Sequence, residues 1–96
     1  MIVMLVRAVV RESSEAECAR ICREVTEASR KEPGCAFYAV HQSRETPQEF
    51  VFYEQYRDRA ALEEHRASTH FLRYREQIAP YVESREAEEL TLVEEL

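Results

Sequence analysis

The chain has 96 residues, which is long enough for one domain with a single core and too short for two. Its 33% charged and 45% hydrophobic residues are typical of a folded globular chain and not of a disordered or fibrous one. The net charge of -6, with no segment that collects basic residues, argues against nucleic-acid binding through counterion release.

Residues 1–10 are predicted to form a β-strand. Aliphatic side chains occupy both of its alternating faces, which indicates a strand that is covered on both sides. Arg7 is the exception, because a single charge among apolar neighbours needs a partner, and we expect Glu54 to supply it. The alternative for Glu54 is an acid in the pocket. The segment is too short for a membrane span and no small-residue cleavage site follows it, so we expect no membrane association and a cytoplasmic location.

An amphipathic helix is predicted within residues 13–34. Ser14 and Glu17 have the spacing of a capping box at its start. Pro33 and Gly34, the only glycine in the chain, mark the end of the helix and a turn.

The chain has three cysteines, Cys18, Cys22 and Cys35. Cys18 and Cys22 lie one helical turn apart and are either a metal or redox pair or two small buried apolar residues. The second interpretation is favoured, because no further ligand lies nearby in the sequence. Without a secretion signal, all three are expected to be reduced thiols.

A β-hairpin is predicted from residues 35–43 and 48–56. Both segments are rich in aromatic and β-branched residues, and a short polar loop joins them.

A second helix is predicted after the hairpin, with Asp58 able to cap its first turn. The helical pattern falters at ASTH, residues 67–70, where Ser68 can cap a resumed helix. The resumed helix is expected to break up near Pro80. Its apolar stripe consists of Phe71, Tyr74, Ile78 and Val82.

The last segment, residues 86–96, is predicted to be a strand because its leucines alternate and because the preceding β-α-β-β-α order needs a partner strand, although its glutamates favour a helix. The predicted order is therefore β-α-β-β-α-β in one domain, residues 1–96, with a ferredoxin-like α+β fold. Right-handed crossovers place both helices on one face of an antiparallel sheet. The other face would expose an apolar surface, and a second copy of the chain is its simplest cover, so a homodimer is expected.

Two stretches, EPGCAFYAV at residues 32–40 and FVFYEQYRDRAALEEHRASTHFLRY at residues 50–74, resemble the antibiotic biosynthesis monooxygenase family. The matching features are the helix-ending turn at 32–35, the strand end at 54–56 and the histidine pattern at 65–71. Within the family, the chain is most similar to the small quinol monooxygenases and to an isomerase that processes a phosphorylated autoinducer. The resemblance implies a dimeric α/β barrel built from ferredoxin-like subunits.

The resemblance also implies oxygenase chemistry without a metal or flavin. A base removes a proton from a quinol- or anthrone-like substrate, and the resulting anion passes an electron directly to O2. The protein then has to supply acid–base groups, orientation and exclusion of water. No cofactor is expected.

His65 is predicted to be the catalytic base, because its distance from Leu62 places it on the inward stripe of the second helix, beside aromatic residues that would keep it neutral. The alternative is a histidine that caps the helix break. His70 is either a second acid–base group or a surface histidine. The residues expected to contact the substrate are Arg7, Tyr53, His70, Phe71 and Tyr74.

No metal site is expected, because a spacing of five residues does not put His65 and His70 on one helical face and no third ligand is evident. Two other functions stay open. One is an isomerase or lyase that acts on a small hydroxylated or phosphorylated carbonyl compound, with Arg7 as the cation for phosphate. The other is a dimer that binds a small molecule without converting it.

Overall fold

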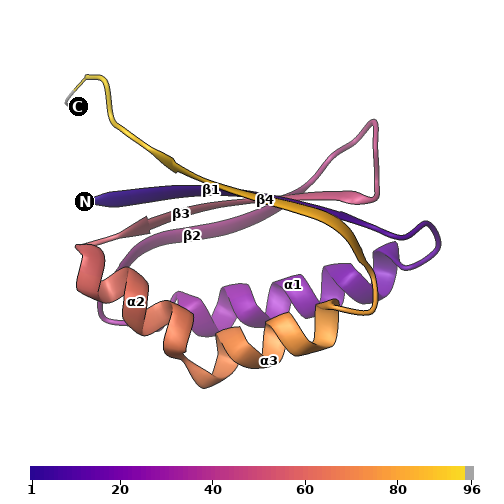
Figure 1. The fold of residues 1–96 in the computed structure, drawn as a ribbon, viewed down its shortest axis with the longest axis horizontal. Helices are drawn as coiled ribbons and strands as arrows, with labels where there is room; N and C mark the ends of the chain where they lie inside the picture. The colour runs from indigo at the N-terminus through magenta and orange to yellow at the C-terminus, as the bar shows by residue number, and fades with distance from the viewer. Residues whose placement is uncertain (95–96) are drawn as a thin grey trace.

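A computed structural model describes residues 1–94 and consists of a four-stranded antiparallel sheet with three helices on one of its faces (Figure 1). Its elements are β1 (Ile2–Val10), α1 (Glu15–Ser29), β2 (Cys35–Gln42), β3 (Glu49–Tyr56), α2 (Arg59–Ala67), α3 (Thr69–Ile78) and β4 (Val82–Leu90). The strand order is β2-β3-β1-β4. The predicted ferredoxin-like α+β fold is confirmed.

The N-terminus of α1 differs from the prediction, because the capping box does not form. The Ser14 hydroxyl donates a hydrogen bond of 2.6 Å to the carbonyl of Arg11 and makes no capping bond to the helix. Ser13, with φ of 75°, turns the chain through the left-handed region just before this point. Such a local bond to a preceding carbonyl competes with capping.

The predicted break between α2 and α3 is confirmed. Asp58 caps α2 by accepting a hydrogen bond of 2.9 Å from the amide of Ala61. Ser68 has an extended backbone, and its hydroxyl accepts from the amide of Phe71 at 3.2 Å while it donates to the carbonyl of His65 at 2.6 Å. None of the helices in residues 1–94 has the length and apolar character of a membrane span.

The last strand begins earlier than predicted. The helix ends at Ile78, so Val82 does not extend its apolar stripe but starts β4. Pro80 explains this change, because a proline cannot continue a helix. Residues 91–94 lie outside any strand, and residues 95–96 of the predicted strand lie outside the described residues. Most residues of β4 are exposed, as expected for a charged edge strand.

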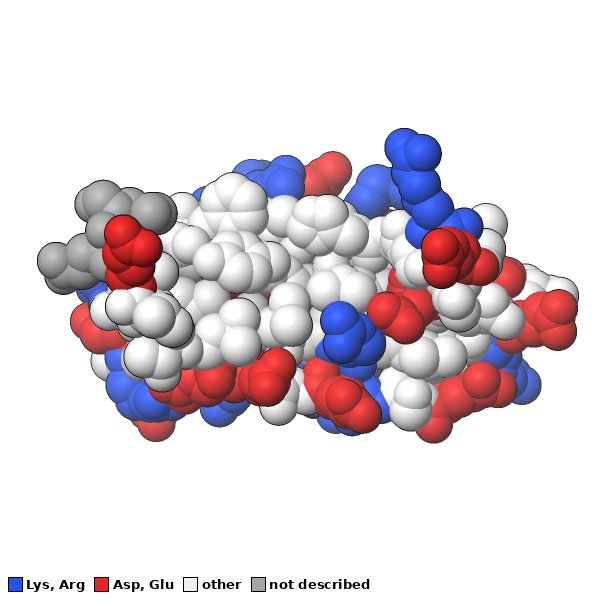
Figure 2. All heavy atoms as spheres, turned by 90° about the horizontal axis from the view of Figure 1, so that it is seen from above, with Lys and Arg blue, Asp and Glu red and all other residues white. Residues whose placement is uncertain are grey.

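The sheet has two chemically different faces. Toward the helices it carries the apolar core, which includes Val6 and Phe52 and the buried thiols of Cys18 and Cys22 from α1, as predicted for the two cysteines. The opposite face, called the open face below, is covered by none of the helices in residues 1–94, and Figure 2 shows a broad uncharged area there with charged side chains around it. Its apolar members are Val3, Leu5, Val9, Phe37, Ala39, Val51 and Tyr53.

The predicted Arg7–Glu54 ion pair is wrong, since the two side chains lie on opposite faces of the sheet. Arg7 stands on the open face, where its Nε lies 3.2 Å from the carboxylate of Glu49. Glu54 pairs with Met4 in the strand register and points toward the helices. Because side chains alternate along a strand, an odd-numbered residue of β1 cannot meet Glu54.

Candidate functional site

His65 lies in the last turn of α2, between the helices and the sheet, and only 2% of its surface is exposed. The inward stripe of α2 buries it together with Leu62, as predicted. Its ring centroid lies 5.5 Å from that of Tyr38, 5.2 Å from that of Tyr56 and 4.9 Å from that of Phe71. The histidine therefore packs among three aromatic rings.

A carboxylate from the turn between α1 and β2 holds this ring. His65 Nδ1 lies 2.8 Å from Glu32 Oε2, and His70 Nε2 makes a hydrogen bond to the same oxygen. A carboxylate only accepts hydrogen bonds, so the proton of a neutral His65 is assigned to Nδ1. Nε2 then carries the lone pair, and it makes no hydrogen bond to any residue in 1–94.

Gly34 allows the turn that carries Glu32 to lie directly against α2. A Cβ atom added at Gly34 would stand 2.4 Å from the Cβ of Ala61, a distance that real Cβ atoms do not show. The carbonyl of Gly34 also accepts a hydrogen bond of 2.8 Å from the amide of Arg57, just before α2. The absent side chain thus brings Glu32 within reach of His65.

A small cleft lies beside His65, with a volume of about 20 Å³. That volume is close to the size of a single water molecule. Polar and charged side chains meet apolar ones around it. Its lining residues are Met4, Val6, Glu54, Leu62, His65, Arg66, Phe71, Arg85 and Ala87.

Glu54 is the buried acid of this cleft, with 6% of its surface exposed. The hydroxyl of Tyr56 donates a hydrogen bond of 2.5 Å to its carboxylate. Burial raises the pKa of Glu54, although this hydrogen bond and the positive charges of Arg85 and Arg66 lower it in part. Glu54 therefore holds a proton to higher pH than an ordinary glutamate.

The pKa of His65 is shifted in the opposite sense. Burial lowers the pKa of His65 below its usual value of 6.5, Glu32 offsets part of this effect, and the charges of His70 and Arg66 add to it. The ring is therefore neutral near pH 7, with a basic nitrogen free to accept a proton.

The model of the antibiotic biosynthesis monooxygenase family matches residues 1–77. The chain belongs to the antibiotic biosynthesis monooxygenase family. The resemblance noted in the sequence is therefore confirmed.

Among its relatives is Rv0793 of Mycobacterium tuberculosis, whose name gives a provisional assignment as a monooxygenase. The two sequences are 46% identical over 50 residues, which cover 52% of this chain and 48% of Rv0793. The matched segment thus spans about half of that relative. The solved structure of Rv0793 has a TM-score of 0.90 to this chain at 28% sequence identity. The alignment covers 98% of this chain and 96% of the Rv0793 chain. A structure from Nitrosomonas europaea, named as a provisional antibiotic biosynthesis monooxygenase, has a TM-score of 0.92 at 28% identity, with coverage of 98% and 100%.

In the present chain, the site residues predicted from the sequence fall into two groups. His70, Phe71 and Tyr74 lie on α3 on the same side of the sheet as His65, with the ring of Tyr74 6.2 Å from that of Phe71. Tyr53 and Arg7 lie on the open face. A single chain therefore cannot bring these last two residues to a ligand that touches His65.

His65 and His70 lie close together, although their spacing of five residues predicted that they would not share one helical face. On a straight helix, residues five apart point about 140° away from each other. The break at Ser68 reorients α3, so His65 and His70 meet at Glu32. The site also contains Arg66 and Arg85, which were not predicted, and Glu54, which had been expected to pair with Arg7. The turn at residues 32–35 matches the family, and this match was the only feature of the sequence that could have pointed to Glu32 as a site residue.

Proposed function

We propose that this protein is a monooxygenase that oxidises a quinol- or anthrone-like aromatic molecule with O2 and without a cofactor. Family membership and the name of Rv0793 support an oxygenase. The observation that carries the proposal is the pair of buried His65 and part-buried Glu32, which leaves a basic Nε2 beside a cleft. A histidine oriented by a carboxylate is a common form of general base.

The proposed reaction begins with proton transfer from the substrate to His65 Nε2. The cationic side chains of Arg66 and Arg85 stabilise the substrate anion that forms. This electron-rich anion gives one electron to O2, and the resulting radical pair forms a C–O bond as a hydroperoxide. The protonated histidine returns its proton to the peroxide, which gives the neutral hydroperoxide. His65 then removes the second proton from the same carbon as the C=O bond forms and the O–O bond breaks, and the hydroxide that leaves takes this proton to become water. A methylene group and O2 thus become a carbonyl group and water.

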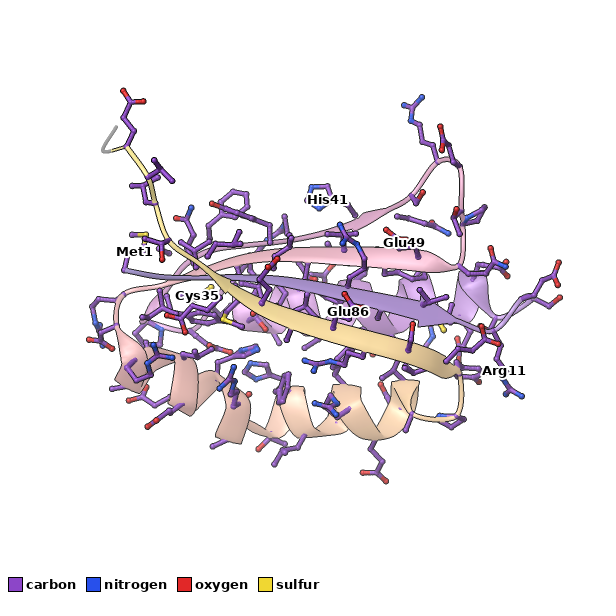
Figure 3. The ribbon with its side chains drawn as sticks, turned by 45° about the horizontal axis from the view of Figure 1, so that its top comes forward. Met1, Arg11, Cys35, His41, Glu49 and Glu86 are labelled. Atoms are coloured by element: carbon purple, nitrogen blue, oxygen red, sulfur yellow. The ribbon has the colours of Figure 1, made fainter. Side chains whose placement is uncertain are left out.

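The test is oxygen uptake on a panel of hydroquinones, naphthols and anthrones. His65→Ala should lower the rate on an active substrate by about a hundredfold or more, the usual effect of losing a general base. His70→Ala should cost far less, because it leaves the Glu32–His65 pair in place. His41→Ala is the matched control, since Figure 3 shows His41 on the side of the sheet away from the helices.

Full activity in His65→Ala, on a substrate that the wild type oxidises, would contradict the assignment of the base. Absence of uptake on the whole panel would contradict the substrate class. Melting curves for each variant separate loss of the base from loss of the fold.

A proton-transferring isomerase or lyase is the second candidate, and the position of Arg66 and Arg85 beside His65 favours it. Two guanidinium groups suit the phosphate or carboxylate of a small carbonyl compound, a role that Arg7 on the open face cannot fill. This function predicts incorporation of solvent deuterium into the substrate carbon without oxygen uptake. A rise in melting temperature with ligand, but no turnover in either assay, would indicate a binding protein.

We also propose that the protein acts as a homodimer joined through the open face. Phe37 and the other apolar side chains there are left uncovered in one protomer, with Phe37 49% exposed. Size-exclusion chromatography with light scattering should give twice the mass of the chain, and Leu5→Arg should shift it toward monomer. A stable wild-type monomer at micromolar concentration would contradict this proposal.

A further inference from the structure

Three potential metal ligands converge at the joint between α2 and α3. Glu32 Oε2, His65 Nδ1 and His70 Nε2 all lie within 4.8 Å of one another. They come from three segments: the turn after α1, the last turn of α2 and the first turn of α3. Within residues 1–94, this is the only group of three such side chains placed so closely.

Two imidazole nitrogens and one carboxylate oxygen are a donor set used by catalytic zinc sites and by non-haem iron sites. Metal bonds of about 2.0–2.2 Å in a tetrahedron hold the donor atoms about 3.4 Å apart. The pair His65 Nδ1 and Glu32 Oε2, now 2.8 Å apart, lies below that spacing, and the ligand atoms of the three residues all lie within 4.8 Å of one another. Shifts of well under 2 Å, about the length of a metal–ligand bond, would suffice to hold an ion.

The burial of the three side chains also suits a metal ion. The side chain of His65 is 2% exposed, that of Glu32 16% and that of His70 27%. The inner ligand is thus fixed by packing, while the outer one borders solvent and leaves an entry path. Three protein ligands leave a fourth position open for water or another small molecule.

We propose that Glu32, His65 and His70 form a site for one divalent transition-metal ion of the Zn²⁺ type. The site is additional to the proposed oxidation, which needs no metal. The carboxylate supplies a negative charge, and both imidazoles are neutral when they bind a metal. Hydrogen bonds now made to Glu32 would be replaced by metal bonds from the same three atoms.

Metal binding would change what His65 presents to the cleft. Nδ1 bonded to the metal cannot keep its proton, so in the neutral ring the proton moves to Nε2. Nε2 then donates a hydrogen bond and has no lone pair with which to accept a proton. This consequence rests on the proposed function: Zn²⁺ would inhibit the oxidation that His65 catalyses as base.

The binding experiment uses Zn²⁺ alone, added to the reduced protein in a titration calorimeter, and Co²⁺ as a spectroscopic substitute. The wild type should bind one ion per chain, with the intense visible bands of a four-coordinate Co²⁺ site. His70→Ala and Glu32→Gln should each weaken binding by at least about tenfold. His41→Ala and Cys35→Ser should bind as the wild type does, because neither residue belongs to the group.

Equal affinity in His70→Ala and Glu32→Gln, or loss of binding in Cys35→Ser instead, would overturn the proposal, as would absence of binding at micromolar Zn²⁺. His70 lies at the surface end of the group, so its variant can be checked by melting to be folded. Inhibition of oxygen uptake by Zn²⁺ in the wild type but not in His70→Ala would link the site to His65. Because calorimetry does not depend on activity, failure of the oxidase assay leaves this test intact.

Discussion

Gly34→Ala is a direct test of how the turn that carries Glu32 is held. The new Cβ would lie 2.4 Å from the Cβ of Ala61, whereas carbon atoms in contact prefer about 3.5–4.0 Å. Overpacking of this kind costs about 1–3 kcal/mol. Gly34 has no positive φ, so alanine can adopt the same backbone conformation. Alanine also lowers the conformational entropy of the unfolded chain, which stabilises the folded protein by about 0.4–1 kcal/mol. The net loss in the free energy of unfolding should be about 1.3 kcal/mol, within a range of about 0–2.6 kcal/mol.

The double variant Gly34→Ala/Ala61→Gly separates the clash from other effects. Ala61→Gly alone should cost about 1 kcal/mol, the usual loss for glycine within a helix. In the double variant the clash is gone, so it should be more stable than the sum of the single changes by about 1–3 kcal/mol. Urea unfolding followed by circular dichroism at one fixed protein concentration measures all four proteins. Additivity within about 0.5 kcal/mol would refute the proposed contact.

Three further predictions follow from other parts of the structure. Burial raises the pKa of Glu54, so the folded state holds a proton that the unfolded state has lost. Wild-type stability should therefore fall as pH rises from about 4.5 through the raised pKa, and this dependence on pH should be weaker in Glu54→Gln. Equal urea midpoints in the two proteins across that pH range would contradict the prediction. Ser68→Ala removes the cap of α3 and should lower the free energy of unfolding by about 1 kcal/mol, measured against Ser84→Ala on exposed β4. Cys35, which is partly exposed, should react with a thiol reagent in the native protein, whereas Cys22, whose pKa burial raises to about 12, should react only as the protein unfolds; fast labelling of Cys22 in native protein would show that the core is open there.

Most of the fold could be predicted from the sequence because the elements before β4 each carried a local signal of their own. The first strand is aliphatic throughout, the hairpin strands are rich in aromatic residues, and Ser68 interrupts an otherwise helical pattern. The start of β4 was harder to place, since an exposed edge strand rich in glutamate lacks the apolar alternation of a buried one. The capping box was predicted but does not form, because the Ser14 hydroxyl donates its hydrogen bond to the carbonyl of Arg11 instead. The spacing of residues in the sequence does not reveal such a competing acceptor.

Half of the site could not be predicted, because its contacts join distant segments. His65 follows from its place on the inward stripe of α2, but Glu32 reaches it from 33 residues away. Arg7 was assigned to Glu54 because both are charges among apolar neighbours. Only the register of β1 against β3, which pairs Arg7 with Val51 and Met4 with Glu54, shows that the two charges face opposite sides.

The joint at Ser68 bears on how a molecule larger than water reaches His65. A continuous helix would lose main-chain hydrogen bonds on bending, but α2 and α3 each close their own, and the extended backbone of Ser68 separates them. A change in the angle between the two helices therefore alters a few backbone dihedrals around one residue and leaves both helices intact. Such hinge motions take microseconds to milliseconds. A hinge at Ser68 would open the cleft without unfolding either helix, and the contacts that oppose it are the hydrogen bonds of the Ser68 hydroxyl to His65 and Phe71 and those of Glu32 to the two histidines.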